Sequence, residues 1–195
     1  MILVAHRRNL RQQLAETPAQ YGIEVDIRSR GEDLIIHHDA FVEGERFEDW
    51  LTAYRHHLLI LNTKEEGLED RLLSLMKRHG IEDFFFLDQS FPFLIRTARQ
   101  GERRCAVRVS EYESVETALS LAGMVEWIWV DCFTRFPLDR ASAQRLKDAG
   151  FKLCLVSPEL QGRTAPEEIA NLRALLAEQG IEADAVCTKT PELWS

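Results

Sequence analysis

One unit recurs along this chain: a segment with helical periodicity, then a glycine, then a short apolar run that predicts a strand. A glycine in this position can adopt the left-handed conformation that ends a helix. The five glycines that mark the unit are Gly22, Gly80, Gly123, Gly150 and Gly180. Helices and strands that alternate in this way predict an α/β fold with a parallel sheet.

The apolar runs are nearly continuous, as expected for strands that are buried on both faces of a parallel sheet. The expected helices are residues 19–21, 68–79, 115–122, 141–149 and 166–179. The expected strands are residues 2–5, 23–25, 58–62, 84–87, 105–109, 127–130, 152–156 and 183–186. Eight βα units predict a TIM (β/α)8 barrel. With 195 residues we expect one compact barrel domain, 1–195, without an inserted domain.

Composition excludes several classes of function. The net charge is −8 and no basic run offsets it, which argues against a nucleic-acid partner. No apolar stretch has the length of a membrane span or a signal peptide, so a cytoplasmic location is expected. The cysteines lack metal-ligand spacing, and buried free thiols in a reducing compartment are favoured over disulfides or a metal site. They are Cys105, Cys132, Cys154 and Cys187.

Side chains that could carry chemistry follow the expected strands near the start of the chain. His6 and Arg7 follow the first strand, and His38 follows another apolar run. Glu24 and Asp26 are two apart in the run from Gly22 to Ile27, which as a whole has the pattern of a strand, so both carboxylates point to the same face. Two carboxylates this close need a cation or a strong donor between them. Because catalytic groups gather at strand ends in parallel barrels, we expect an active site here.

The order and spacing of these residues resemble the glycerophosphodiester phosphodiesterase family, which belongs to the phospholipase-C-like phosphodiesterase barrels. That family carries His-Arg after its first strand, Glu-x-Asp on the second, then His-Asp, and Ile-Glu-Ile-Lys on the third strand. The matching segments here are His6-Arg7, Glu24-Val25-Asp26, His38-Asp39 and Leu61-Asn62-Thr63-Lys64. Each segment alone is common, but four in the right order are specific. The resemblance is strong only before residue 65.

The resemblance implies a phosphoric diester hydrolase of lipid metabolism that acts on a small polar phosphodiester, with glycerophosphodiesters as the default substrate. His6 and His38 would be its acid–base pair, and a neighbouring alcohol of the substrate would attack first to give a cyclic phosphate. Arg7 and Lys64 would contact the phosphate. His37 is the rival to His38, and the His-Asp order favours His38.

The resemblance also implies a divalent cation, magnesium or calcium, held by Glu24, Asp26 and Asn62. Asn62 stands where the family has a carboxylate, and two protein charges instead of three must weaken metal binding. A salt bridge from the carboxylates to Arg7 or Lys64 is the open alternative.

Two other functions stay open. A catalytically silent barrel could bind a phosphorylated small molecule through Arg7 and Lys64. This alternative stays open because Asn62 replaces a carboxylate of the family. A sugar-phosphate lyase or isomerase is the third candidate. Family members usually carry an insertion after the His-Asp, and its absence predicts either an open mouth or one covered by a second subunit of a homo-oligomer. Further candidate site residues at strand ends are Asp88, Arg108, Ser110 and Asp131.

Overall fold

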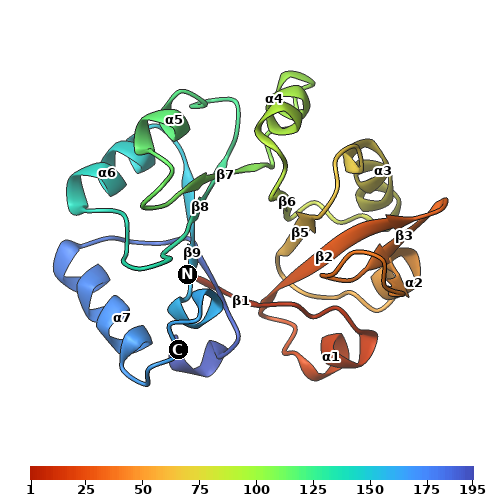
Figure 1. Cartoon of the computed structure of the whole chain (residues 1–195), viewed down its shortest axis with the longest axis horizontal. Coiled ribbons are helices and arrows are strands. Elements are labelled where there is room, and N and C mark those ends of the chain that lie inside the picture. Colours follow the sequence, from red (N-terminus) through yellow and green to blue (C-terminus); the bar gives the residue numbers. More distant parts are fainter.

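The computed structural model describes all 195 residues and has an α/β fold (Figure 1). Eight strands run parallel in the order β6-β5-β2-β1-β10-β9-β8-β7. They are β1 (Ile2–Ala5), β2 (Gly22–Arg30), β5 (Leu59–Thr63), β6 (Phe84–Leu87), β7 (Ala106–Val109), β8 (Trp127–Val130), β9 (Lys152–Val156) and β10 (Ala185–Thr188). The predicted parallel sheet is confirmed in all eight of its strands.

Helices cover the outside of the curled sheet (Figure 1). They are α1 (Arg11–Glu16), α2 (Phe47–Leu51), α3 (Glu69–His79), α4 (Phe91–Arg99), α5 (Val115–Leu119), α6 (Arg140–Asp148) and α7 (Glu168–Gln179). Two short 3₁₀ helices, Pro158–Gln161 and Pro191–Leu193, follow β9 and β10. No helix has the length and apolar character needed to cross a membrane.

The sheet curls into most of a barrel, with β6 and β7 as its edges. One isolated parallel bridge joins these edges, between Phe86 of β6 and Cys105, the residue before β7. The Phe86 N–H donates to the Arg104 carbonyl over 2.9 Å, and no further pairing follows toward the carboxyl ends. The curled parallel sheet of the predicted (β/α)8 barrel is therefore confirmed. A closed barrel is not, because no continuous ladder joins β6 to β7.

β2 continues beyond the parallel sheet into a small antiparallel extension. It pairs with β3 (Asp33–Ile36), and β3 pairs with β4 (Glu45–Arg46). This extension stands out beside α2 (Figure 1). The apolar run before His38 is thus a strand, as predicted, but it belongs to a hairpin on β2 and not to the barrel wall.

Gly22 corrects one copy of the predicted repeat. Residues 19–21 form a turn instead of a helix, because Pro18 cannot continue the helix α1 (Arg11–Glu16). Gly22 itself lies inside β2, where an added Cβ would come within 2.9 Å of Val4 Cγ2. The glycine therefore serves close packing of β1 against β2. By contrast, Gly80 and Gly180 have the predicted left-handed conformation, with φ of 66° and 63°.

Apolar side chains fill the interior of the curled sheet up to its carboxyl end. Phe85 and Trp127 stack there with ring centroids 4.6 Å apart, and Trp129 packs in the same cluster. A second, larger cluster lies between the sheet and the helices. All four cysteines are buried and free, as predicted. Because the interior is packed, polar side chains collect only above it, at the carboxyl ends of the strands.

Candidate active site

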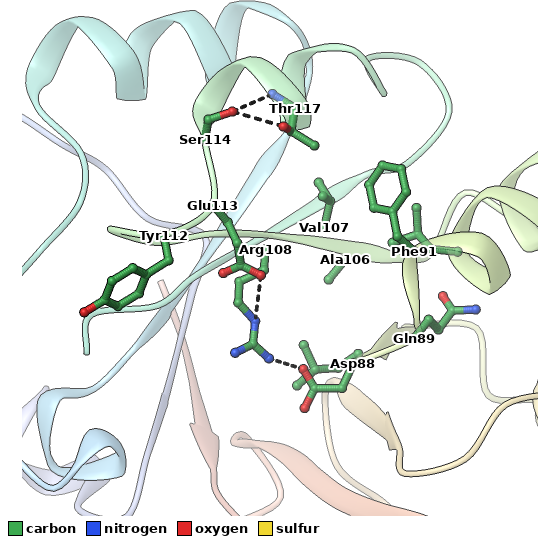
Figure 2. A pocket seen from close by; sticks show the side chains of 12 residues that line it. Asp88, Gln89, Phe91, Ala106, Val107, Arg108, Tyr112, Glu113, Ser114 and Thr117 are labelled. Atoms are coloured by element: carbon green, nitrogen blue, oxygen red, sulfur yellow. Dashed lines mark hydrogen bonds and ion pairs between the residues drawn. The ribbon is translucent and has the colours of Figure 1, made fainter. Parts of the chain in front are cut away.

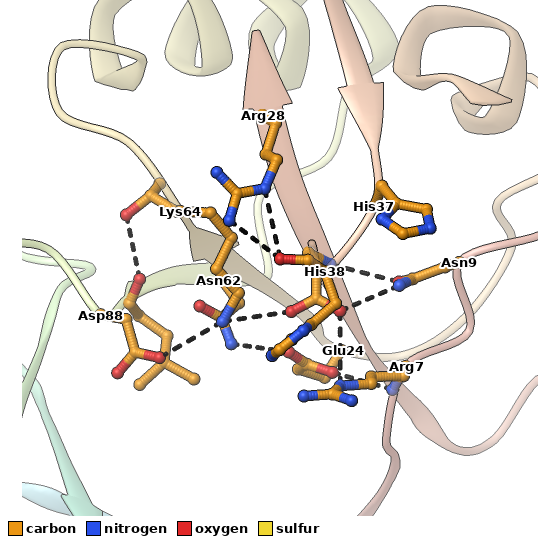
Figure 3. Close-up of polar contacts among 12 residues, drawn as sticks. Arg7, Asn9, Glu24, Arg28, His37, His38, Asn62, Lys64 and Asp88 are labelled. Atoms are coloured by element: carbon orange, nitrogen blue, oxygen red, sulfur yellow. Dashed lines mark hydrogen bonds and ion pairs between the residues drawn. The ribbon is translucent and has the colours of Figure 1, made fainter. Parts of the chain in front are cut away.

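The first candidate residues come together at the carboxyl ends of three neighbouring strands. His6 directly follows β1, Glu24 and Asp26 lie on β2, and Lys64 directly follows β5. Asp26 is in register with Asn62 of β5. Alternation along each strand turns these side chains toward the barrel interior, above the apolar cluster. Figure 3 shows the polar contacts of this group.

Glu24 is almost completely buried, with 1% of its surface exposed. Its Oε2 accepts the Arg7 backbone N–H over 2.8 Å, and its Oε1 accepts the Asn62 side-chain N–H over 2.9 Å. Burial, together with the neighbouring Asp26 carboxylate, raises the pKa of Glu24 to about 7. Glu24 is therefore a carboxyl group that can hold a proton near neutral pH.

Asp26 is fully buried and is surrounded by cationic and amide groups. Lys64 Nζ lies 3.2 Å from Oδ1, and Arg7 Nε lies 3.5 Å from Oδ2. Asn9, which the sequence did not single out, donates its side-chain N–H to Oδ2 over 2.9 Å. The salt bridges considered from the sequence are thus present at Asp26. The one ionisable side chain within 4 Å of the Glu24 carboxyl oxygens that could form an ion pair with it is the imidazole of His6, at 3.7 Å.

His6 is mostly buried beside these carboxylates. Burial and the charge of Arg7 lower the pKa of His6 to about 3, against the opposing pull of Asp26. The imidazole of His6 is therefore neutral near pH 7, and its buried Nδ1 has no hydrogen-bond partner.

His38 follows β3 and is more exposed than His6. Its Nδ1 lies 2.7 Å from Asp39 Oδ1, and this hydrogen bond lowers the pKa of the Asp39 carboxyl. An Nδ1–H that donates to Asp39 leaves Nε2 for the substrate. Arg28 holds the backbone by donating to the His38 carbonyl over 2.9 Å. Figure 3 shows His38 among the side chains of the group, while His37 lies to one side.

His37 instead makes a local contact, because its Nδ1 accepts the Asp39 backbone N–H over 2.9 Å. Both histidines line an open cleft with Arg7. The contacts give His38 a carboxylate partner at Asp39 that His37 lacks, and the catalytic assignment of both His6 and His38 stays a prediction.

A second polar group completes the rim of the barrel mouth. Asp88, just after β6, lies 3.6 Å from Lys64 Nζ and also pairs with Arg108 of β7. Arg108 NH1 in turn lies 3.0 Å from the buried Asp131, just after β8, and burial raises the pKa of that carboxyl. Ser110 stands apart, since its hydroxyl donates to Glu113. Asp88 is thus the link between Lys64 and the far side of the mouth.

Solved structures share this architecture across nearly the whole chain. A candidate glycerophosphoryl diester phosphodiesterase of Agrobacterium tumefaciens superposes with a TM-score of 0.71 at 12% identity, over 99% of this chain and 95% of that one. A glycerophosphoryl diester phosphodiesterase of Parabacteroides distasonis gives 0.68 at 15% identity, over 98% and 84%. The chain has the fold of the glycerophosphodiester phosphodiesterases. No family model and no curated protein sequence matches it.

A second glycerophosphodiester phosphodiesterase of Agrobacterium tumefaciens agrees, with a TM-score of 0.68 at 13% identity over 100% of this chain and 98% of that one. A tryptophan synthase α-subunit from Pyrococcus furiosus is less similar, at 0.51 and 12% identity over 98% and 88%. These similarities cover nearly the whole chain, although the family resemblance in the sequence is strong only before residue 65.

The structure allows us to ask whether Glu24, Asp26 and Asn62 could hold the divalent cation that was expected from the sequence. Asn62 Oδ1 is buried without a hydrogen-bond partner, and the neighbouring Asp26 Oδ1 faces Lys64 Nζ at 3.2 Å; oxygens of this kind suit a hard divalent cation. No group of three or more His, Cys, Asp or Glu side chains is placed to hold a metal, because the third position is an amide. A cation at this position would have two carboxylate ligands, Glu24 and Asp26, and one neutral amide ligand, Asn62.

Proposed function

We propose that this protein is a metal-dependent phosphodiesterase that hydrolyses a small polar phosphodiester of the glycerophosphodiester type. The observation that carries the proposal is the meeting of His6, Glu24, Asp26 and Lys64 at the carboxyl ends of adjacent strands. This is the edge where barrel enzymes hold their active sites. The shared fold with glycerophosphodiester phosphodiesterases supports the same reaction class.

The two histidines divide the proton transfers. Neutral His6 takes the proton of the substrate hydroxyl that attacks phosphorus, and a P–O bond forms to that oxygen. The P–O bond to the leaving alcohol breaks, and His38, oriented by Asp39, protonates that alcohol. Water then opens the cyclic phosphate with the histidine roles reversed, so that one water is consumed and one alcohol is released.

Positive charge must meet the non-bridging phosphate oxygens, where negative charge is concentrated. Lys64 and Arg7 supply it from opposite sides of Asp26, which holds both side chains in place. A magnesium or calcium ion, when bound, would be held by Glu24, Asp26 and Asn62 and would add charge to the same oxygens. Glu24 would be deprotonated in that state, since a ligating carboxyl gives up its proton.

Histidine variants test this proposal in a screen of glycerophosphodiesters with and without magnesium, calcium and manganese. His6→Ala and His38→Ala should each lower the rate of alcohol release by roughly 10²-fold or more. His37→Ala is the matched control at the adjacent position and should lose little. A His37 variant as inactive as the His38 variant would reject the acid–base assignment.

A catalytically silent barrel is the second candidate. It is favoured by Asn62 and by the internal pairing of Asp26 with Lys64 and Arg7, which leaves the carboxylate neutralised without a metal. This candidate predicts that glycerol phosphate binds in a calorimetric titration and that Lys64→Met weakens the binding. It also predicts that no diester turns over with any of the three metals.

A further inference from the structure

A cleft opens where β6 and β7 fail to pair. Beyond the single Phe86–Cys105 bridge, no pairing joins Leu87 and Asp88 to the strand β7, and the cleft lies here (Figure 2). Its apolar lining comprises Leu87, Phe91, Leu94, Ala106 and Val107. The cavity has a volume of about 610 Å³, which lies within the range of small-molecule sites. A continuous ladder would have closed this gap.

The cleft adjoins the candidate active site at Asp88. This carboxylate lines the cleft, pairs with Arg108 on the opposite strand and lies 3.6 Å from Lys64 Nζ. Asp88 has a φ of 60°, a left-handed conformation that is uncommon outside glycine. One residue therefore forms the boundary between the phosphate-binding lysine and the cleft, so a single ligand can reach both.

Most polar groups of the cleft already have partners, although the buried Gln89 Oε1 has none. Arg108 binds Asp88 and Asp131, and the Ser114 hydroxyl accepts the Thr117 backbone N–H over 3.1 Å. Gln89 donates its amide to neighbours outside the cleft. A sugar or a second phosphate would have to break such bonds to be recognised, at a cost in free energy.

Among the apolar side chains, Leu87, Leu94, Ala106 and Val107 are already buried in the core, and Phe91 is the one left exposed. Phe91 on α4 is 48% exposed although Leu94, one turn later, is buried in the core. Figure 2 shows the Phe91 ring at one side of the opening, near Val107 and facing Thr117 across it. Covering the Phe91 ring would gain free energy, because its exposed surface leaves water. The lining thus favours an apolar occupant over a polyol.

We propose that this cleft binds an alkyl or acyl chain of the substrate, so that the preferred phosphodiesters are amphiphilic. The assignment rests on the proposed function for the position of the phosphate, which Lys64 and Arg7 contact. The chain leaves the mouth past Asp88 and lies between β6 and β7 against Leu87, Ala106 and Phe91. The interior of the barrel is packed, so this lateral gap is the apolar space adjoining the phosphate site.

A chain-length series tests the cleft by binding alone. The probes are glycerol phosphodiesters of butyl, hexyl and octyl alcohol, titrated calorimetrically below their aggregation concentrations into the active-site variant His6→Ala. The dissociation constant should fall with each added methylene, by up to about fourfold. In the Phe91→Ser background, the octyl probe should lose roughly fivefold to tenfold in affinity while the butyl probe changes little.

Leu193→Ser is the matched control, because Leu193 is equally exposed, at 49%, and lies outside the cleft. It should alter neither probe. Chain-length-independent binding, an absence of binding, or equal losses in both serine variants would overturn the cleft assignment. Wild-type turnover separates the two proposals: hydrolysis of short diesters without chain dependence retains the phosphodiesterase and rejects the cleft. Phe91-dependent octyl binding without any turnover retains the cleft and rejects the phosphodiesterase.

Discussion

His6 and Glu24 lie 3.7 Å apart, and the pKa values of the two groups move in opposite directions. Burial is the main cause in both cases, because it disfavours the charged form of either side chain. The imidazole is neutral down to about pH 3, and the carboxyl keeps its proton up to about pH 7. The site therefore carries less charge than its sequence suggests, and a substrate phosphate meets Lys64 and Arg7 without a fully ionised carboxylate pair beside them.

Glu24 should make folding stability depend on pH in the metal-free protein. Its folded pKa of about 7 exceeds the unfolded 4.5, so its stabilising effect is complete below pH 4.5 and is lost as pH rises through 7. His6 acts oppositely, because its pKa is depressed from 6.5 to about 3 and stability is lost as pH falls through that window. Comparison with Glu24→Gln cancels the histidine contribution.

We expect the difference in unfolding free energy between wild type and Glu24→Gln to shift by about 2 kcal/mol between pH 5 and pH 8, in favour of the variant at pH 8. Urea unfolding in the presence of EDTA measures this difference. A constant difference across the range would mean that Glu24 is ionised throughout.

Asn62 allows a direct test of the metal site. Asn62→Glu replaces the amide that donates to Glu24 with a third carboxylate beside Glu24 and Asp26. Repulsion among buried carboxylates should lower the melting temperature without metal, and magnesium or calcium should restore it. Calorimetric titration should show tighter metal binding than in wild type. Asn62→Ala is the control, since it removes the same hydrogen bond without adding charge; equal metal affinity in both variants would argue against a site here.

At the scale of elements, close packing between β1 and β2 depends on Gly22. A Cβ there would meet Val4 Cγ2 at 2.9 Å and the Leu58 carbonyl oxygen at 3.1 Å. Gly22→Ala should therefore cost roughly 1–3 kcal/mol of unfolding free energy in urea titrations. The cost should shrink in a Val4→Ala background, where the closest atom is gone. Gly31→Ala is the control, because no atom lies within 4 Å of its added Cβ and any cost comes from its φ of 59°.

The strands could be predicted from the sequence because each is a short, continuous apolar run between polar segments. α4 was missed: Phe91, Pro92 and Phe93 open it, and a proline among aromatic residues resembles a loop until its place at the first helical turn is known. The hairpin was missed in part, because Ile35 and Ile36 look the same on a barrel strand and on an antiparallel extension. Local pattern identifies strands but not their partners.

In the candidate site, too, the sequence pattern predicted the residues on one strand but not the contacts that depend on tertiary structure. Alternation on one strand was enough to place Glu24 and Asp26 together, and neighbouring strands brought Asn62 beside them. Asn9 could not be predicted, because its contact with Asp26 depends on how the loop after β1 folds back. Asp88 was recognised only as a strand-end residue, since its link between Lys64 and Arg108 requires the curvature of the whole sheet.

At the scale of the molecule, the last strand in sequence is a central strand of the sheet. β10 pairs with β1 on one side and β9 on the other, so the first and last strands join two arcs of four parallel strands each. The free edges meet on the opposite side, at β6 and β7, where one bridge holds them. The sheet is therefore strongest where its termini meet and weakest beside the cleft.

Hydrogen exchange should reveal this asymmetry. Amides of β10, bonded between two neighbours, should exchange only through global unfolding, whereas peptides covering residues 87–90 and 108–112 beside the seam should exchange roughly 10²-fold faster or more. β8, one strand inside the edge, is the internal control and should match β10. Equal protection at the seam and in β10 would mean that β6 and β7 pair along their full length in solution. The barrel would then be closed, and the space assigned to an apolar chain would be filled by the sheet itself.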